Sequence, residues 1–185
     1  MARLDAYLSV LNHWHKAINL VSKDSLRDPW RRHFWDSAQL LPLIPPASES
    51  VVDLGSGAGF PGAVLSILGV SSVHLIESDG RKCAFLREVS RVTGAEFAVH
   101  QRRIDDVIPW QAGVVTARAL APLAVLLGYA GRFLGPQSIG LFLKGGGVDR
   151  ELTAAAKGWN MTAERIASRS SPTGTILRLS EVRRK

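Results

Sequence analysis

A glycine-rich loop follows a short apolar stretch in the first half of the chain. Residues 51–62 read VVDLGSGAGFPG. Glycines at 55, 57 and 59 allow the backbone to approach a ligand closely where a strand ends. Gly57, Gly59 and Gly62 also match the pattern G-x-G-x-x-G, so the loop by itself fits a nicotinamide or flavin dinucleotide, another nucleoside cofactor, or a purely structural glycine turn.

Two carboxylates beside the loop favour one of these cofactors. Asp53 precedes the glycines, where it would repel a pyrophosphate and would suit a ligand that carries a cation. Glu77 is expected to end the next strand, in a position to accept hydrogen bonds from ribose hydroxyls. A dinucleotide and S-adenosylmethionine both need such an acceptor. S-adenosylmethionine carries a sulfonium and an ammonium group and no phosphate. The sequence therefore favours S-adenosylmethionine over a dinucleotide.

From residue 50 onward the hydrophobic pattern alternates between strand and helix. Helices are expected from near Pro61 and over 81–92, 123–133 and 149–157, and in the second of these Phe85, Leu86, Val89 and Val92 form the inward face. Strands are expected over 50–54, 73–76, 97–100, 114–117, 139–143 and 176–179. This alternation predicts an α/β doubly wound fold with a mainly parallel sheet.

The first 46 residues are predicted to form a helical N-terminal extension that packs on the main domain. Their apolar residues keep a spacing of three to four, and Asp28-Pro29 resembles an N-cap followed by proline at the first helical position of a second helix, which should end near Pro42. Pro45-Pro46-Ala47-Ser48 is a short linker. The predicted division is therefore an extension over 1–46 and a main domain over 47–185.

The charge is unevenly distributed along this basic chain. Its 185 residues carry a net charge of +7, and arginine supplies 17 of the 23 basic residues. Residues 51–80 carry −3, whereas 81–103 carry +4 and 157–185 carry +5. This pattern suits a small-molecule pocket surrounded by a surface for a polyanion, although ordinary solvated helix faces would give the same pattern.

Several classes of protein are disfavoured by composition. Cys83 is the only cysteine, which excludes a disulfide framework and a thiolate zinc site, and the five histidines show no metal-ligand spacing, so we expect no metal. The amino terminus has no signal-peptide pattern, and the longest apolar run, residues 120–130, is shorter than the about 20 residues of a membrane span. We expect a cytoplasmic monomer with no membrane association.

Short motifs along residues 10 to 155 together carry a family resemblance. They are Asn19-Leu20-Val21-Ser22, Arg32-His33-Phe34-Trp35-Asp36-Ser37, the loop 53–62, Glu77-Ser78-Asp79-Gly80-Arg81-Lys82, Gln101-Arg102-Arg103-Ile104-Asp105, Thr116-Ala117-Arg118-Ala119 and Leu143-Lys144-Gly145. In this order they resemble the bacterial small-subunit rRNA guanine-N7 methyltransferases, the GidB or RsmG family. The glycine loop alone would indicate only a methyltransferase, whereas the other motifs are far more specific.

The resemblance implies a class I S-adenosylmethionine-dependent methyltransferase fold, Rossmann-like, and methyl transfer to N7 of one guanine in small-subunit (16S) rRNA. The implied partner is that rRNA or the ribosomal particle. By position, the resemblance implies that Gly55 and Phe60 line the cofactor, that Glu77 faces the ribose and that Ile104 and Asp105 lie by the adenine. Arg118 is the matching binding position after the fourth strand. With the loop residues, the expected cofactor-binding set is Asp53, Gly55, Gly57, Gly59, Phe60, Glu77, Ile104, Asp105 and Arg118.

The chemistry of the sequence agrees with this implication. N7 of guanine offers an in-plane lone pair, so the reaction needs positioning and electrostatics more than a general base. Methylation of a pyrimidine at C5 would need a nucleophilic cysteine, and Cys83 is expected in a helix away from the strand ends. Methylation of an adenine amino group usually shows Asp/Asn-Pro-Pro-aromatic, where this chain has residues 117–120, ARAL.

Cations are expected on the same rim as the cofactor, because ligands bind beyond the carboxyl ends of parallel strands. Arg118 and Lys144 are predicted to act in catalysis by gripping the target nucleotide or its phosphates; alternatively, Arg118 pairs with Asp105 or Glu77. The expected RNA-binding set is Arg32, His33, Arg103, Arg118 and Lys144. His33 shares a helix face with Asp36, so docking of that helix on the sheet is an equally good interpretation. The alternative functions are an NAD(P)-dependent oxidoreductase and a non-catalytic RNA-binding protein with a vestigial cofactor loop.

Overall fold

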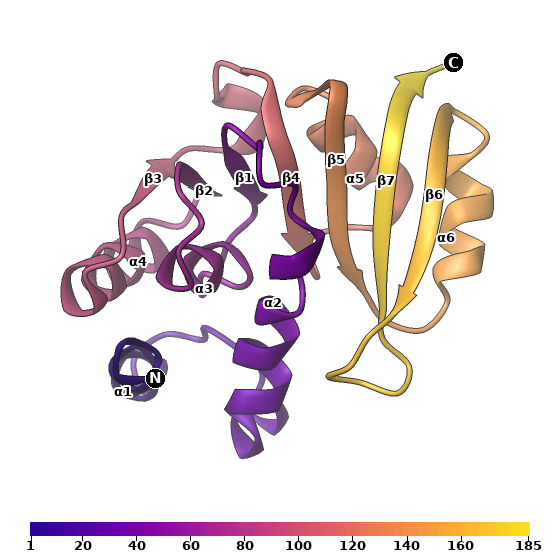
Figure 1. Cartoon of the computed structure of the whole chain (residues 1–185). Helices are drawn as coiled ribbons and strands as arrows, with labels where there is room; N and C mark the ends of the chain where they lie inside the picture. Colours follow the sequence, from indigo (N-terminus) through magenta and orange to yellow (C-terminus); the bar gives the residue numbers. More distant parts are fainter.

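A seven-stranded sheet forms the centre of the molecule in a computed structural model that describes all 185 residues (Figure 1). The strands are β1 (Val51–Leu54), β2 (Val73–Glu77), β3 (Phe97–Gln101), β4 (Ala112–Arg118), β5 (Leu134–Lys144), β6 (Trp159–Ala167) and β7 (Thr175–Arg184). Their order is β3-β2-β1-β4-β5-β7-β6. The first five are parallel to one another, while β7 runs antiparallel to β5 and to β6. The predicted doubly wound, mainly parallel sheet is confirmed.

Strand β6 was not predicted, and its composition explains why. None of its residues is fully buried, and exposed and half-buried positions alternate along it. It lies at the edge of the sheet and pairs only with β7. An edge strand of this kind lacks the continuous apolar run that marks a buried strand.

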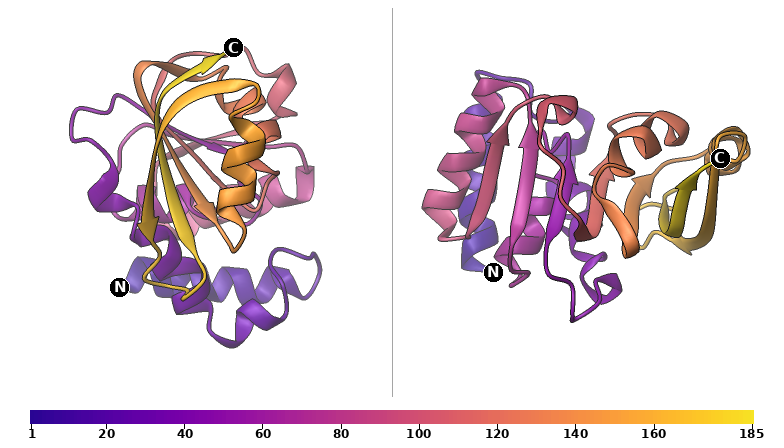
Figure 2. Two further views of the ribbon diagram at one scale, coloured as in Figure 1. Left: turned by 90° about the vertical axis from the view of Figure 1, so that its right-hand side faces the viewer. Right: turned by 90° about the horizontal axis from the view of Figure 1, so that it is seen from above.

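Helices cover both faces of the sheet (Figures 1 and 2). On one face α3 (Gly62–Ile67) and α4 (Gly80–Thr93) share a core with Val51, Leu75 and Val114, and on the other α5 (Leu123–Ala130) and α6 (Val148–Ala155) share a core with their chain neighbours Val52, Ile76 and Val115. Successive residues of a strand point to opposite faces, so each strand contributes to both cores.

Helix α4 shows how the sequence sets its limits. The Asp79 side chain accepts hydrogen bonds from the backbone of Arg81 and Lys82 and caps the first turn, and Gly94 ends the helix in the left-handed conformation. Phe85, Leu86 and Val89 are buried as predicted, but Val92 is 37% exposed and does not belong to the inward face.

The N-terminal segment is less regular than predicted. After α1 (Ala2–His15) come a 3₁₀ turn η1 (Asp24–Arg27), a π-helical turn η2 (Trp30–Trp35), a short α2 (Asp36–Ala38) and a 3₁₀ turn η3 (Leu41–Leu43), instead of one helix from 28 to 42. The carboxylate of Asp28 accepts from the backbone of Arg31, as expected of a cap. Side-chain hydrogen bonds to helix carbonyls, from Ser37 to His33 and from Gln39 to Asp36, compete with a regular ladder.

This segment packs beneath the glycine loop rather than standing apart. Tyr7 is fully buried, donates a hydrogen bond to the carbonyl of Ala58 and stacks on Phe60 at 5.3 Å between ring centroids. The guanidinium of Arg3 donates to the carbonyls of Ile67, Thr93 and Gly94 at the ends of α3 and α4. The N-terminal residues therefore share one core with the sheet. The division near residue 46 stays a prediction. No helix is long and apolar enough to cross a membrane.

Candidate functional site

Two cavities open beyond the carboxyl ends of the parallel strands and meet at the glycine loop. The larger has a volume of about 750 Å³ and the smaller of about 350 Å³. The residues that line both are Gly55, Gly57, Lys82, Ala119 and Leu120. A ligand that lies across this junction would have one part in each cavity.

The glycines of the loop divide into two that face the cavities and two that face the interior. Gly55 has φ +62°, and a Cβ there would lie 2.5 Å from Cδ1 of Leu120. A Cβ on Gly59 would lie 2.7 Å from Oη of Tyr7, and one on Gly62 would lie 2.3 Å from Cδ2 of Leu75. Gly59 lines neither cavity, which corrects its expected place in the cofactor set. The second half of the G-x-G-x-x-G match therefore serves internal packing.

Asp53 also lies beneath the loop and not beside a ligand. Its side chain is fully buried, accepts a hydrogen bond from Oγ1 of Thr116 at 2.8 Å and one from the backbone N–H of Gly62 at 3.4 Å, and lines neither cavity. Burial raises the pKa of Asp53 to about 6, against the lowering effect of these hydrogen bonds. The expectation that this carboxylate faces the cofactor is corrected: it anchors the loop from below. Thr116, its register partner on β4, was missed, and its only signal is a polar residue in a buried strand.

Glu77 takes the position that the sequence predicted for it. It ends β2, lines the smaller cavity and is 8% exposed. Its carboxylate accepts from the backbone N–H of Gly57 at 2.9 Å and of Asp79 at 2.8 Å. A negative charge therefore already occupies one of the loop N–H groups that a pyrophosphate would need. Arg103, Ile104 and Asp105 line the same cavity.

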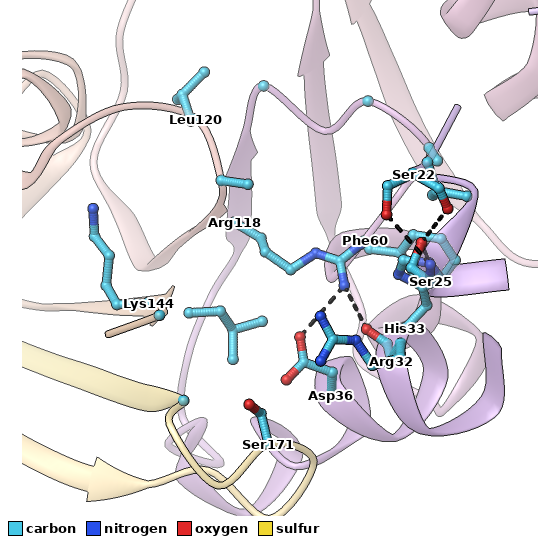
Figure 3. A pocket seen from close by; sticks show the side chains of 18 of the residues that line it. Ser22, Ser25, Arg32, His33, Asp36, Phe60, Arg118, Leu120, Lys144 and Ser171 are labelled. Atoms are coloured by element: carbon cyan, nitrogen blue, oxygen red, sulfur yellow. Dashed lines mark hydrogen bonds and ion pairs between the residues drawn. The ribbon is translucent and has the colours of Figure 1, made fainter. Parts of the chain in front are cut away.

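Arg118 reaches into the larger cavity and binds to the N-terminal segment (Figure 3). Its Nη1 donates to the carbonyl of Arg32 at 3.0 Å and to Oδ2 of Asp36 at 3.4 Å, and its Cζ lies 4.9 Å from the ring centroid of Phe60. The alternative that Arg118 pairs with Asp105 or Glu77 is wrong, because its carboxylate partner is Asp36. Phe60 lines the same cavity.

His33 is part of the cavity wall and carries no charge. Its side chain is buried and stacks on Phe60 at 4.8 Å. Burial, then the charges of Arg118 and Arg32, lower the pKa of His33 to about 3. Its Nε2 lies 2.9 Å from Oγ of Ser25, which itself donates to the carbonyl of Ser22, so Nε2 carries the hydrogen. This geometry fits the docking interpretation of His33 and not a cationic contact with RNA.

The remaining predicted cations differ in their freedom. Lys144 is 9% exposed, and its Nζ donates to the carbonyl of Ala121 at 2.8 Å and to Oε2 of Glu151 at 2.7 Å. The ammonium group of Lys144 thus already has two partners within the chain, and its grip on the target nucleotide or its phosphates stays a prediction. Arg32 lines the larger cavity and Arg103 the smaller; both are exposed, and their guanidinium groups make no hydrogen bond within the chain. Lys82, which sequence reasoning missed although it lies in a matching motif, lines both cavities.

A hydroxyl-rich loop between β6 and β7 completes the larger cavity, and no motif in the sequence predicts it. Ser168, Ser170 and Ser171 line this cavity. Oγ of Ser170 donates to the carboxylate of Asp36, and Gln39 binds Ser168, so the hairpin tip is tied to the N-terminal segment (Figure 2). Nowhere in the chain do three His, Cys, Asp or Glu side chains gather where they could hold a metal ion.

Comparisons with known proteins find a matching family. The family model for rRNA small subunit methyltransferase G, GidB, matches residues 1–174. The ribosomal RNA small subunit methyltransferase G of Rhodospirillum rubrum is 56% identical over 182 residues, which cover 98% of this chain and 90% of that protein.

Solved structures share the fold at low sequence identity. One is a ribosomal protein L11 methylase from Lactobacillus delbrueckii subsp. bulgaricus, with a TM-score of 0.61, 16% identity and coverage of 78% of this chain and 75% of that one. Another is a TehB-like SAM-dependent methyltransferase from Corynebacterium glutamicum, with a TM-score of 0.61, 16% identity and coverage of 85% and 96%. The predicted Rossmann-like class I methyltransferase fold is confirmed.

Proposed function

Because this chain belongs to the rRNA small subunit methyltransferase G family, GidB, we infer that it transfers a methyl group from S-adenosylmethionine to N7 of one guanine in small-subunit (16S) rRNA. The observation that best supports this activity is the junction of the two cavities at the glycine loop, where the carboxylate of Glu77 accepts a hydrogen bond from the loop N–H of Gly57. The dinucleotide alternative is disfavoured by that carboxylate and by the family.

The residues of the smaller cavity fit the nucleoside part of S-adenosylmethionine. Glu77 keeps lone pairs free for ribose hydroxyls after it has accepted two backbone N–H groups. Ile104 and Asp105 would lie by the adenine, and Gly55, Gly57 and Phe60 would line the amino-acid part towards the larger cavity. When bound, the cofactor supplies a methyl group on a positively charged sulfur.

The larger cavity would hold the target guanine, and its residues would position the base. The N7 lone pair attacks without loss of a proton, so no general base is required. Two titratable side chains that line this cavity are unsuited to the role of a base: His33 is a buried neutral ring, and Asp36 is bound to Arg118 and Ser170. The guanine ring becomes cationic on methylation, so Arg118 should contact O6, a phosphate or the cofactor carboxylate and stay away from N7.

Cations around the two cavities would hold the RNA backbone. Arg32, Lys82 and Arg103 lie at the cavity walls, and the +5 segment 157–185 contains the β6–β7 hairpin that borders the larger cavity. Phosphate contacts of this kind give affinity and register, whereas the cavity gives the choice of base. We also propose that the protein acts as a monomer in the cytoplasm, on rRNA or on a ribosomal particle.

The proposed function is tested by mapping N7-methylguanine in the small-subunit rRNA of cells with and without this gene. We expect one modified guanine to disappear without the gene and to return with the intact chain, but not with Glu77→Ala. Purified protein should bind S-adenosylmethionine by calorimetry and should not bind NAD(P). An unchanged methylation map, or RNA binding that is the same with and without S-adenosylmethionine together with no methyl transfer, would instead support a non-catalytic RNA-binding protein.

A further inference from the structure

The segment between β4 and α5 forms a wall of the site with unused polar backbone. We call residues 119–122 the wall segment: all four line the larger cavity, and Ala119 and Leu120 also line the smaller. The N–H groups of Ala119, Leu120 and Ala121 and the carbonyls of Ala119 and Leu120 make no hydrogen bond within the chain. Ala119 has φ +51°, which is unusual for a residue with a side chain.

A single ion pair binds the wall segment at its far end. Nζ of Lys144, at the end of β5, donates to the carbonyl of Ala121 at 2.8 Å, and Oε2 of Glu151, on α6, accepts from the backbone N–H of Leu123 at 2.7 Å. Lys144 and Glu151 lie 2.7 Å apart. The pair therefore binds one backbone carbonyl and one backbone N–H on either side of Pro122.

Stability alone gives a weak reason for such a pair. Lys144 is 9% exposed and Glu151 30%, and an ion pair taken partly out of water contributes little to net stability, since the desolvation of both charges offsets their attraction. The position of the pair suits a different purpose, because the wall segment lines both cavities and has a strained residue, backbone groups without a hydrogen bond and few other hydrogen bonds to hold it.

We propose that Lys144 and Glu151 are positioning residues, which hold the wall segment so that its free backbone groups bind the polar edge of the target guanine. The proposal rests on the function inferred above. Guanine presents O6 as an acceptor and N1–H and N2–H as donors, so a backbone with both free N–H and free C=O groups can bind it. Adenine presents an amino donor and the N1 acceptor in the reverse arrangement.

Removing the charge of Glu151 distinguishes this positioning role from a role in which Lys144 grips an RNA phosphate. If Lys144 gripped phosphate, Glu151→Gln would release that cation and would tighten RNA binding. If the pair positions the wall segment, the same substitution loosens the hydrogen bond to Leu123 and slows methyl transfer. The two roles therefore predict different results for one nearly isosteric change: tighter RNA binding if Lys144 grips phosphate, and slower methyl transfer if the pair positions the wall segment.

The experiment compares Glu151→Gln, Lys144→Met and the double variant in single-turnover methylation of 16S rRNA. A misplacement of about an ångström can cost about 100-fold in rate, so we expect each single variant to lower the rate constant about 10- to 100-fold. KM for RNA and the affinity for S-adenosylmethionine by calorimetry should change less than about twofold. Since the two residues act as a unit, the double variant should be no slower than the slower single variant.

Two further measurements separate positioning from a loss of folding and from failure of the inferred activity. Hydrogen exchange of the backbone amides over 123–126, which needs no substrate, should accelerate in both single variants. Asp149→Asn is the matched control, because it removes an exposed carboxylate from the same helix, where it pairs with Arg165 at 2.9 Å, and should leave rate and exchange unchanged. Lys144→Arg, which keeps the cation, should retain more activity than Lys144→Met.

A wild-type rate in Glu151→Gln, or a raised KM with an unchanged rate in Lys144→Met, would refute the positioning role. Unchanged exchange over 123–126 would also refute it. The unmodified protein could fail to methylate N7 while hydrogen exchange still accelerates in the two single variants. In that case the inferred activity is wrong, but the ion pair still binds the wall segment.

Discussion

Gly55 of the glycine loop lies against Leu120 of the wall segment, so replacing Gly55 by alanine should disturb Leu120. The new methyl group would sit 2.5 Å from Cδ1 of Leu120 and would occupy a residue with φ +62°. A left-handed alanine costs about 1–2 kcal/mol. The clash adds about 1–3 kcal/mol if Leu120 stays and less if it moves, and Leu120 can move because it is only half-buried.

Gly94 provides a matched control for the backbone strain. It has the same φ of +62°, at the end of α4, and a Cβ there would meet no atom within 4 Å. Gly94→Ala should therefore lower the free energy of unfolding by the strain alone, about 1–2 kcal/mol. Gly55→Ala should cost about 1 kcal/mol more. Because Leu120 lines both cavities at their junction, Gly55→Ala should also weaken S-adenosylmethionine binding about tenfold or more, which is about 1.4 kcal/mol.

Urea unfolding and calorimetric titration with S-adenosylmethionine measure these two effects separately. Leu120→Ala in the Gly55→Ala background should restore the part of the loss that comes from the clash, and leave the strain. Equal losses of stability in Gly55→Ala and Gly94→Ala, with cofactor affinity unaffected in both and no effect of Leu120→Ala, would show that the loop and the wall segment are not in the contact described here.

Three further changes test other parts of the site. Asp53 has a folded-state pKa of about 6, above that of an unfolded aspartate. Its contribution to stability is therefore present below about pH 4 and is lost as pH rises through 6, by about 3 kcal/mol. Asp53→Asn should remove this pH dependence of the free energy of unfolding, measured by urea unfolding at about pH 4–7. Asp36→Asn should lower the stability by about 1–3 kcal/mol and should also lower the methylation rate, because Arg118 loses its carboxylate partner. Asp24→Asn, the control in an exposed ion pair, should cost under about 0.5 kcal/mol. Equal effects of the two substitutions would argue against the Arg118 contact. Arg103→Ala should weaken RNA binding and make the log–log salt slope shallower by about 0.7, and an unchanged slope in filter binding would remove Arg103 from the phosphate contacts.

Local patterns in the sequence are enough to predict the fold class and the position of the cofactor loop. They predict β1, β2 and β3 to within one residue of their observed bounds, because buried strands in a parallel sheet are apolar runs that end at glycine or polar residues. The predicted ranges for β4 and β5 are shorter than the observed strands, since β5 begins at Leu134 and not at 139. That topology brings the ends of β1, β2, β4 and β5 to one edge, so Gly55, Glu77 and Arg118 could be placed near each other without any tertiary information.

Which of these side chains face the cavities, and which groups bind them, depends on tertiary packing. Asp53 and Glu77 both lie near strand ends, but Asp53 points into the core towards Thr116, and Glu77 towards the loop. Arg118 binds Asp36, 82 positions earlier in the chain, and Lys144 binds Glu151 on the following helix. Strand periodicity fixes where a residue stands on the sheet. The partner of a charged side chain, its burial and its pKa depend on the packing of distant segments, which no local pattern encodes.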